Sequence, residues 1–147
     1  MNASELLEFL RAQKWAVEAS VGATGAPQAA VIGIAVTDGF ELVFDTLGST
    51  RKAENLRRDP RIALVIGWDD GRTVQLEGIA DEPTGVELEQ LVEKYLERFP
   101  DGVERRAWPE IAYFRVRPSW LRYSDFRGSE PVVLTFEGAT LTELMAG

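Results

Sequence analysis

Four consecutive residues, Ser49-Thr50-Arg51-Lys52, place two hydroxyls and two cations at the start of a predicted helix. The N-terminus of a helix carries partial positive charge, so cations are unfavourable there unless something compensates them. The unpaired N–H groups of a first helical turn, the hydroxyls and an arginine that can grip two oxygens at once all suit a phosphate group. The alternative is an exposed helix whose charges are simply solvated.

This helix, predicted over Thr50 to Arg58, has cations at both ends, and the helix dipole favours them at only one. Arg57 and Arg58 lie at the C-terminal end, where the helix dipole favours cations. Only the N-terminal pair breaks the local rule, and such a break indicates function. The segment lacks the glycine pattern of a P-loop or of a dinucleotide-binding fold, so a phosphate site of neither type is predicted.

The composition of the 147-residue chain limits the chemistry that remains. Cysteine and histidine are both absent, which excludes disulfides, thiol chemistry and the commonest metal ligand and general base. The net charge of -8 argues against nucleic-acid binding, which needs clustered Lys and Arg. No apolar run approaches the roughly 20 residues of a membrane span, and Met1 to Gln13 is a poor signal peptide. We therefore expect one cytoplasmic domain, residues 1–147, that binds neither membranes nor nucleic acid.

Short alternating segments bounded by turn residues predict a mainly antiparallel β structure. The expected strands are Trp15 to Val21, Ala29 to Val36, Glu41 to Asp45, Arg61 to Trp68, Arg72 to Asp81, Ile111 to Val116, Trp120 to Phe126 and Val132 to Phe136. A first helix runs from an N-cap at Ser4 to about Gln13, and Pro83 opens a long amphipathic helix. Many short strands with few helices favour a closed antiparallel barrel.

From Gly25 to Asp81 the sequence resembles the pyridoxamine 5'-phosphate oxidase-like flavoproteins, which are FMN-binding split β-barrels. The segments that carry the resemblance are GAPQAAVIGIAVTDGFELVFDT, LGSTRKAENLRRDPRIALVIGW and RTVQLEG, in the family's order and nearly its spacing. The resemblance implies a mainly β or α+β protein: an antiparallel split barrel of six to seven strands with flanking helices. It also implies a homodimer with FMN at the interface.

The resemblance assigns roles to individual residues. Arg51 and Lys52 match the pair that binds the FMN phosphate, and Ser49 and Thr50 match the turn that assists them. Asp45 and Thr46 match the strand end that lies along the flavin, and Ala30, Val31, Ile32 and Gly33 match the strand whose backbone runs beside its ring. Either Thr73 or Gln75 matches the residue that reaches the flavin or its phosphate, and Gln75 is preferred. Trp120 and Arg122 are the candidates for positions near the partner's flavin. Trp120 and Arg122 have an alternative interpretation as a core tryptophan and a surface arginine.

The function implied is that of an FMN-dependent oxidoreductase with an unidentified small-molecule substrate; no catalytic side chain is nominated. Pyridoxamine 5'-phosphate itself is disfavoured as the substrate, because the chain has no histidine and carries Ala35 where a basic residue often stands. One alternative is a reductase that uses the deazaflavin F420, which the acidic charge of the chain disfavours. Another is a flavin-binding or haem-binding module without turnover, although ordinary haem ligation lacks its histidine.

Overall fold

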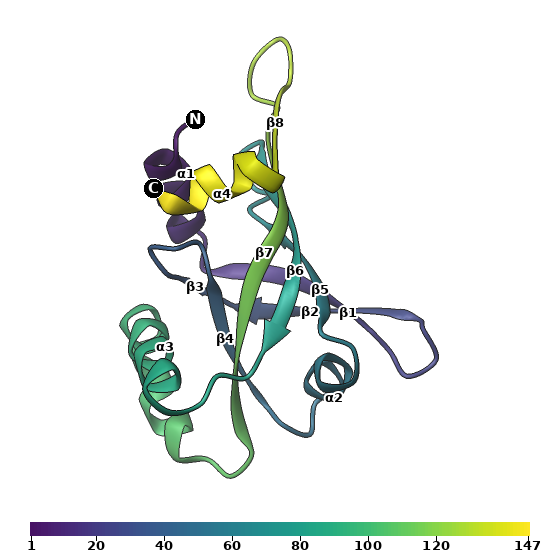
Figure 1. The fold of residues 1–147 in the computed structure, drawn as a ribbon, viewed down its shortest axis with the longest axis vertical. Coiled ribbons are helices and arrows are strands. Elements are labelled where there is room, and N and C mark those ends of the chain that lie inside the picture. Colours follow the sequence, from purple (N-terminus) through teal and green to yellow (C-terminus); the bar gives the residue numbers. More distant parts are fainter.

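Eight strands form one antiparallel sheet in the computed structural model, which describes residues 1–147. The elements are α1 (Ala3–Ala12), β1 (Trp15–Val21), β2 (Pro27–Gly33), β3 (Ala35–Val36), β4 (Leu42–Leu47), α2 (Arg51–Arg58), β5 (Arg61–Ile66), β6 (Arg72–Asp81), α3 (Gly85–Arg98), the 3-10 helix η1 (Pro100–Ala107), β7 (Ile111–Asp125), β8 (Val132–Glu137) and α4 (Gly138–Ala146). Figure 1 shows the sheet curled, with α2 and α3 flanking β4 and β7 from opposite sides.

The order of the strands explains how the sheet curls. It runs β2-β1-β5-β6-β7-β4-β3, with β8 paired to β7. The two outermost strands, β2 and β3, are separated in the chain only by Ile34, so they are the halves of one bent strand. The run Ala29 to Val36, predicted as a single strand, is therefore split: its first half pairs with β1 and its second with β4. Counted as one, these halves give seven strands, and the predicted split-barrel class is confirmed.

Two groups of buried side chains hold the helices to the barrel. The larger fills the interior and includes Phe44, Phe114 and Leu121 together with Leu6 and Leu10 of α1. The smaller group lies outside the barrel. There Tyr95 of α3 and Phe99, which lies between α3 and η1, pack with Tyr113 of β7. Neither α1 nor any other helix is both long and apolar enough to cross a membrane.

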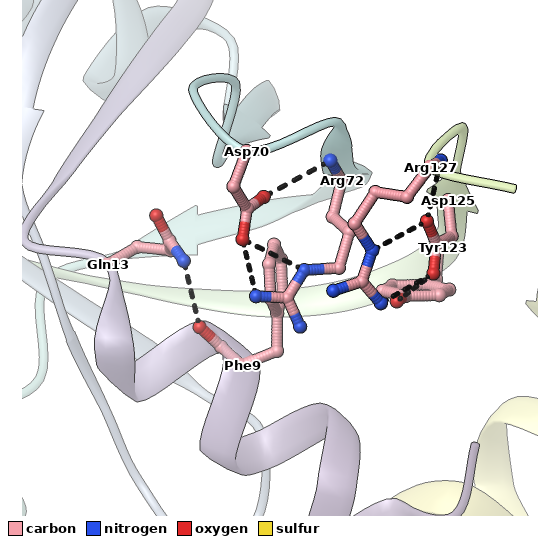
Figure 2. A network of polar contacts seen from close by, with 7 residues as sticks. All are labelled: Phe9, Gln13, Asp70, Arg72, Tyr123, Asp125 and Arg127. Atoms are coloured by element: carbon pink, nitrogen blue, oxygen red, sulfur yellow. Dashed lines mark hydrogen bonds and ion pairs between the residues drawn. The ribbon is translucent and has the colours of Figure 1, made fainter.

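Helix α1 packs against the barrel core through Leu6 and Leu10, and Figure 2 shows its Phe9 close to Arg72. The Phe9 ring meets the Tyr123 ring edge-on, with centroids 5.7 Å apart, and the Arg72 guanidinium lies 4.9 Å from the Phe9 ring centre. Asp70 holds Arg72 in this position through an ion pair. These contacts attach α1 to the ends of β6 and β7, away from α2 (Figure 1).

Three predicted boundaries differ from the structure, one of them at α3, which begins at Gly85 after the N-cap Thr84 and not at Pro83. The first helix is capped by Asn2 and not by Ser4. Asn2 and Glu5 form a capping box, in which the Asn2 side chain accepts a hydrogen bond from the Glu5 N–H and the Glu5 side chain accepts one from the Asn2 N–H. The two late strands predicted on either side of Pro118 form the single strand β7. Pro118 is accommodated because the ladder between β6 and β7 shifts register there, a bulge at which a missing N–H is tolerated.

Helix α4 has no counterpart among the predicted elements. It follows β8 directly, and a capping box between Glu137 and Thr140 starts it. Leu141 and Leu144 then bury one face against the barrel core. Its short length and weak amphipathic pattern leave little local signal, so tertiary burial defines this helix.

Candidate functional site

Helix α2 begins at Arg51, with Thr50 as its N-cap. The Thr50 hydroxyl accepts the Ala53 N–H at 3.4 Å, donates to the Leu47 carbonyl at 2.9 Å, and lies 2.9 Å from the Thr46 hydroxyl. In a helix of this kind the first backbone N–H groups have no partner within the helix. The turn thus offers free N–H donors beside two cations.

The basic side chains at the two ends of α2 differ in whether they have a partner within the protein. At the C-terminal end Arg57 pairs with Glu82 at 2.8 Å, and Arg58 lies 3.3 Å from the Asn55 side-chain oxygen. The side chains of Arg51 and Lys52 make no hydrogen bond and no ion pair within the protein. Both cations at the unfavourable end are therefore available to a ligand.

A hollow of about 280 Å³ lies between the start of α2 and strands β1 and β2; we call it the α2 pocket. Its lining residues are Glu18, Ser20, Gln28, Ala29, Ala30, Thr50, Arg51, Lys52 and Asn55. Strand β2 stands at one end of the strand order, so it is paired in the sheet along one edge only. The pocket combines a helix N-terminus, two free cations and several hydroxyl and amide groups, which together suit an oxygen-rich anion.

The floor of the α2 pocket is a hydrogen-bonded group from three elements. The buried Asn55 amide of α2 donates to the Ser20 hydroxyl of β1 at 3.1 Å and to the Gln28 side-chain oxygen of β2 at 2.8 Å. These bonds lock α2 onto the two strands. They set the distance between the cations of α2 and the opposite wall.

Glu18 is the unexpected member of the pocket. Its side chain is only 1% exposed, and its Oε2 atom has no hydrogen-bond partner. Burial raises the pKa of the Glu18 carboxyl to about 7, although the positive charge of Lys52 and the neighbouring Ser20 hydroxyl oppose the shift. Glu18 is thus a buried acid that is half protonated near neutral pH.

Some of the predicted cofactor residues meet at this pocket. Thr50, Arg51, Lys52 and Ala30 line it. Thr46 is joined to it through the Thr50 hydroxyl. Ser49 precedes the cap, is exposed, and does not line the hollow.

Other predicted residues lie elsewhere. Asp45 points to the opposite face of β4 from Thr46, where its carboxylate accepts from the Tyr95 hydroxyl at 3.0 Å and from Arg105 Nε at 2.9 Å. Ile32 is buried in the interior core. Gly33 lies against the Phe99 ring, which a Cβ atom would approach to 2.6 Å. Asp45 is engaged in hydrogen bonds, Ile32 and Gly33 are engaged in packing, and none of the three lines the α2 pocket.

A second group of predicted residues gathers on the outer face of the sheet. The ladder partners that follow one another across β2, β1, β5, β6 and β7 are the predicted residues Val31, Gln75 and Arg122, with the unpredicted Val17 and Val65 between Val31 and Gln75. We call this the outer row. Thr73 and Trp120 lie beside it on β6 and β7, and the Arg122 guanidinium sits 5.0 Å from the Trp120 ring centre.

The outer row is too long for one small ligand to reach both ends. Four steps of about 4.8 Å from strand to strand place Arg122 roughly 19 Å from Val31 along the curled surface of the sheet. Much of the surface between them is apolar, with Val31 64% and Val65 38% exposed. Within one chain the predicted residues therefore form two separate groups, the α2 pocket and the far end of the outer row.

Five residues of the α2 pocket were not predicted: Ala29 and the four polar residues Glu18, Ser20, Gln28 and Asn55. Asn55 had a local signal, since it is a polar residue between Ala53 and Leu56 on the buried side of a short helix. Glu18 had one too, as the only charged residue in β1. Ser20 and Gln28 had none, because only the fold brings their strands against α2.

A larger hollow, of about 530 Å³, lies between α1 and the ends of β6, β7 and β8. It also contains arginines, but Arg72 is paired with Asp70 and Arg127 with Asp125 (Figure 2). Their charge is already used within the protein. The contrast with Arg51 and Lys52 makes the α2 pocket the better anion site.

Comparison with known proteins agrees with this architecture. A family model described as pyridoxamine 5'-phosphate oxidase matches residues 3–125. The chain belongs to this family. The match covers the α2 pocket, the whole of the outer row and every strand but β8. None of the curated protein sequences matches the chain.

Several solved structures share the family fold. A haem-binding protein from Mycobacterium smegmatis has a TM-score of 0.83 at 18% identity, over 97% of this chain and 61% of its own. HutZ, a haem storage protein from Vibrio cholerae, has a TM-score of 0.71 at 17% identity, over 95% and 99%. An FMN-binding, pyridoxamine 5'-phosphate oxidase-related protein from Nostoc punctiforme has a TM-score of 0.68 at 12% identity, over 92% and 86%. The chain thus spans less than two thirds of the Mycobacterium smegmatis protein.

Proposed function

We propose that this family member binds FMN, with the phosphate in the α2 pocket, and works as a flavin-dependent oxidoreductase on a small-molecule substrate. The observation that carries the proposal is the unpaired state of Arg51 and Lys52 at the open N-terminus of α2. Two cations beside free backbone N–H groups form no ion pair with any side chain of the protein, and the one acid that faces them, Glu18, is buried without contacting either. A phosphate ester supplies the missing charge.

The donor set fits that group. Arg51 is able to hold two phosphate oxygens, Lys52 adds a point charge, and the backbone at the start of α2 donates further N–H groups. Thr50 and Ser49 offer hydroxyls nearby, and Thr46 positions Thr50. The unpaired edge of β2, with Ala30 and Val31, leaves room for the rest of a flavin to lie along the strand.

When bound, FMN supplies the redox chemistry, and the protein's share is to hold, orient and shield it. The chain has no cysteine or histidine that would act as nucleophile or base. Its contribution is therefore binding: the phosphate at α2, and an apolar surface beside β2 that excludes water from the ring.

We further propose that the protein is a homodimer formed through the outer row. The exposed valines Val31 and Val65 form an apolar surface. A second copy seated on that surface would bring its own Gln75, Trp120 and Arg122 near the first copy's β2. This would unite the two groups of predicted residues, which lie on different parts of the surface of a single chain.

A second candidate function is haem or flavin binding without turnover. It is favoured by the likeness to the haem-binding and haem storage proteins of Mycobacterium smegmatis and Vibrio cholerae. The absence of histidine from the chain argues against the haem version, because ordinary haem ligation uses it.

The absorption spectrum of the purified protein, before and after incubation with FMN, F420 or haem, separates these candidates. We expect a flavin spectrum, and binding of FMN much tighter than binding of riboflavin, which lacks the phosphate. Mixing the FMN-loaded protein with NADH or NADPH and then air tests turnover. Bleaching and recovery would support the oxidoreductase, their absence would support storage, and failure to bind FMN would overturn the proposal.

A further inference from the structure

The α2 pocket contains a buried acid that a phosphate site does not ordinarily need. Glu18 projects from β1 into the same hollow as Arg51 and Lys52, is 1% exposed, and leaves Oε2 without a partner. An ionised carboxylate beside a phosphate dianion would repel it in a region of low dielectric. A neutral carboxylic acid would instead have an O–H to donate.

We propose that Glu18 is a further binding residue of the α2 pocket, which holds a phosphate ester as the neutral acid, donating its O–H to a phosphate oxygen. The inference rests on the proposed function and deepens it. Because the acid must be neutral in the complex, binding of the ester takes up one proton from solvent whenever Glu18 is ionised in the free protein.

The groups around Glu18 support this assignment. From α2 it faces the charge of Lys52 and the neutral amide of Asn55, with Arg51 at the rim. From β2 it faces Ala30 and the neutral side chain of Gln28, and from β5 its ladder partner is Leu64. Lys52 is therefore the only charge that acts on Glu18 appreciably in the free protein, and a bound phosphate would compete with Glu18 for it.

The protonation states of both partners define a pH window. Burial raises the pKa of Glu18 to about 7, so the free protein loses this proton above neutrality. A phosphate monoester becomes a dianion above about pH 6. Affinity should therefore rise toward pH 6 to 7 as the ester ionises, and then fall by up to about tenfold per pH unit as Glu18 ionises.

Titration of the full-length protein with FMN and with riboflavin between pH 5.5 and 9 tests the inference. For the unaltered protein we expect FMN affinity with both a rising and a falling limb. Calorimetry in buffers of different ionisation enthalpy should register an uptake of about one proton at pH 8. Riboflavin has no phosphate, so its affinity should show neither limb.

Two variants make the test specific. Glu18→Gln keeps a neutral hydrogen-bond donor of the same shape, so it should retain the rising limb, lose the falling limb and take up no proton at pH 8. Glu18→Ala should also lose the falling limb, but bind FMN about tenfold or more weakly than Glu18→Gln at pH 6.5, because the donor is gone.

The outcomes separate the two proposals. A falling limb and proton uptake that persist in Glu18→Gln would overturn the role of Glu18 while leaving FMN binding intact. Equal affinity of Glu18→Ala and Glu18→Gln would overturn the hydrogen bond. If the unaltered protein binds no FMN at any pH, the proposed function is wrong and the inference fails with it.

Discussion

The side-chain amide of Asn55 donates to the Gln28 side-chain oxygen at 2.8 Å, and this bond joins helix α2 to the edge strand β2. A second bond from the same nitrogen reaches the Ser20 hydroxyl on β1 at 3.1 Å. One buried amide therefore connects the helix that carries Arg51 and Lys52 with both strands on the other side of the pocket. The geometry of the site depends on it.

Replacing this amide should destabilise the protein. Asn55→Ala removes both hydrogen bonds that the amide donates and leaves the buried Ser20 hydroxyl and the half-buried Gln28 oxygen without this donor, so we expect the free energy of unfolding to fall by about 1 to 3 kcal/mol. Urea denaturation measures it. Glu54→Gln, on the exposed side of the same turn, is the control and should change stability by less than about 0.5 kcal/mol. Equal losses in both variants would contradict the anchoring role of Asn55.

The two free cations should matter for binding and little for folding. Arg51→Ala combined with Lys52→Ala removes charge-assisted phosphate contacts of about 1.5 to 3 kcal/mol each, so FMN affinity should fall at least about a hundredfold. Riboflavin affinity and the melting temperature should stay nearly unchanged, since neither side chain forms a hydrogen bond or an ion pair within the protein. Fluorescence titration measures the affinities.

A matched pair of single variants tests position against charge. Arg51→Ala and Arg58→Ala each remove one arginine from α2, at its first and last residue. Only Arg51→Ala should weaken FMN binding more than about threefold, because Arg58 lies at the end where the dipole already favours it. Similar losses in both would indicate a general effect of charge.

The buried acid should make stability depend on pH. The pKa of Glu18 rises from an ordinary 4.5 to about 7 on folding, so the native state holds this proton more tightly than the unfolded chain. The resulting stability is fully present below pH 4.5 and is lost as pH rises through about 7. Glu18→Gln, which has no proton to lose, should therefore be more stable than the unaltered protein by about 2 to 3 kcal/mol at pH 8.

Denaturation at several pH values between 4.5 and 8 measures this difference. The gain from Glu18→Gln should shrink to nearly zero at the acid end of the range. Glu77→Gln, an exposed glutamate on β6, provides the comparison and should show no such trend. A constant difference across the range would contradict the titration of Glu18 in the native state.

The outer row should decide the oligomeric state. Val31→Asp places a charge on an apolar surface that is 64% exposed in one chain, and burying that charge between two copies would cost about 2 to 5 kcal/mol. Analytical ultracentrifugation should then show a dimer for the unaltered protein and a monomer for the variant. Val86→Asp, on an α3 residue that is 73% exposed, should remain dimeric.

Local features of the sequence were sufficient to locate the N-terminus of helix α2. A helix N-terminus depends on its own first residues, and Thr50, Arg51 and Lys52 supply the cap and the cations within three positions. Strand β6 was predicted over the same residues, Arg72 to Asp81, because alternation and flanking turns are also local. Strand β7 was wrongly predicted as two strands separated at Pro118, because the bulge that accommodates this proline is visible only in the pairing with β6.

Tertiary structure alone decided which face of β1 would be buried. Alternation in this strand separates Trp15, Val17, Ala19 and Val21 from Ala16, Glu18 and Ser20, and hydrophobicity would bury the first set. The structure buries the second set, because Ala16 joins the interior core while α2 brings Asn55 to Ser20 and the charge of Lys52 to Glu18. Sequence determined the cations at the start of α2, since a helix end is local. The fold determined the acid placed opposite them, since that contact joins residues more than 30 positions apart.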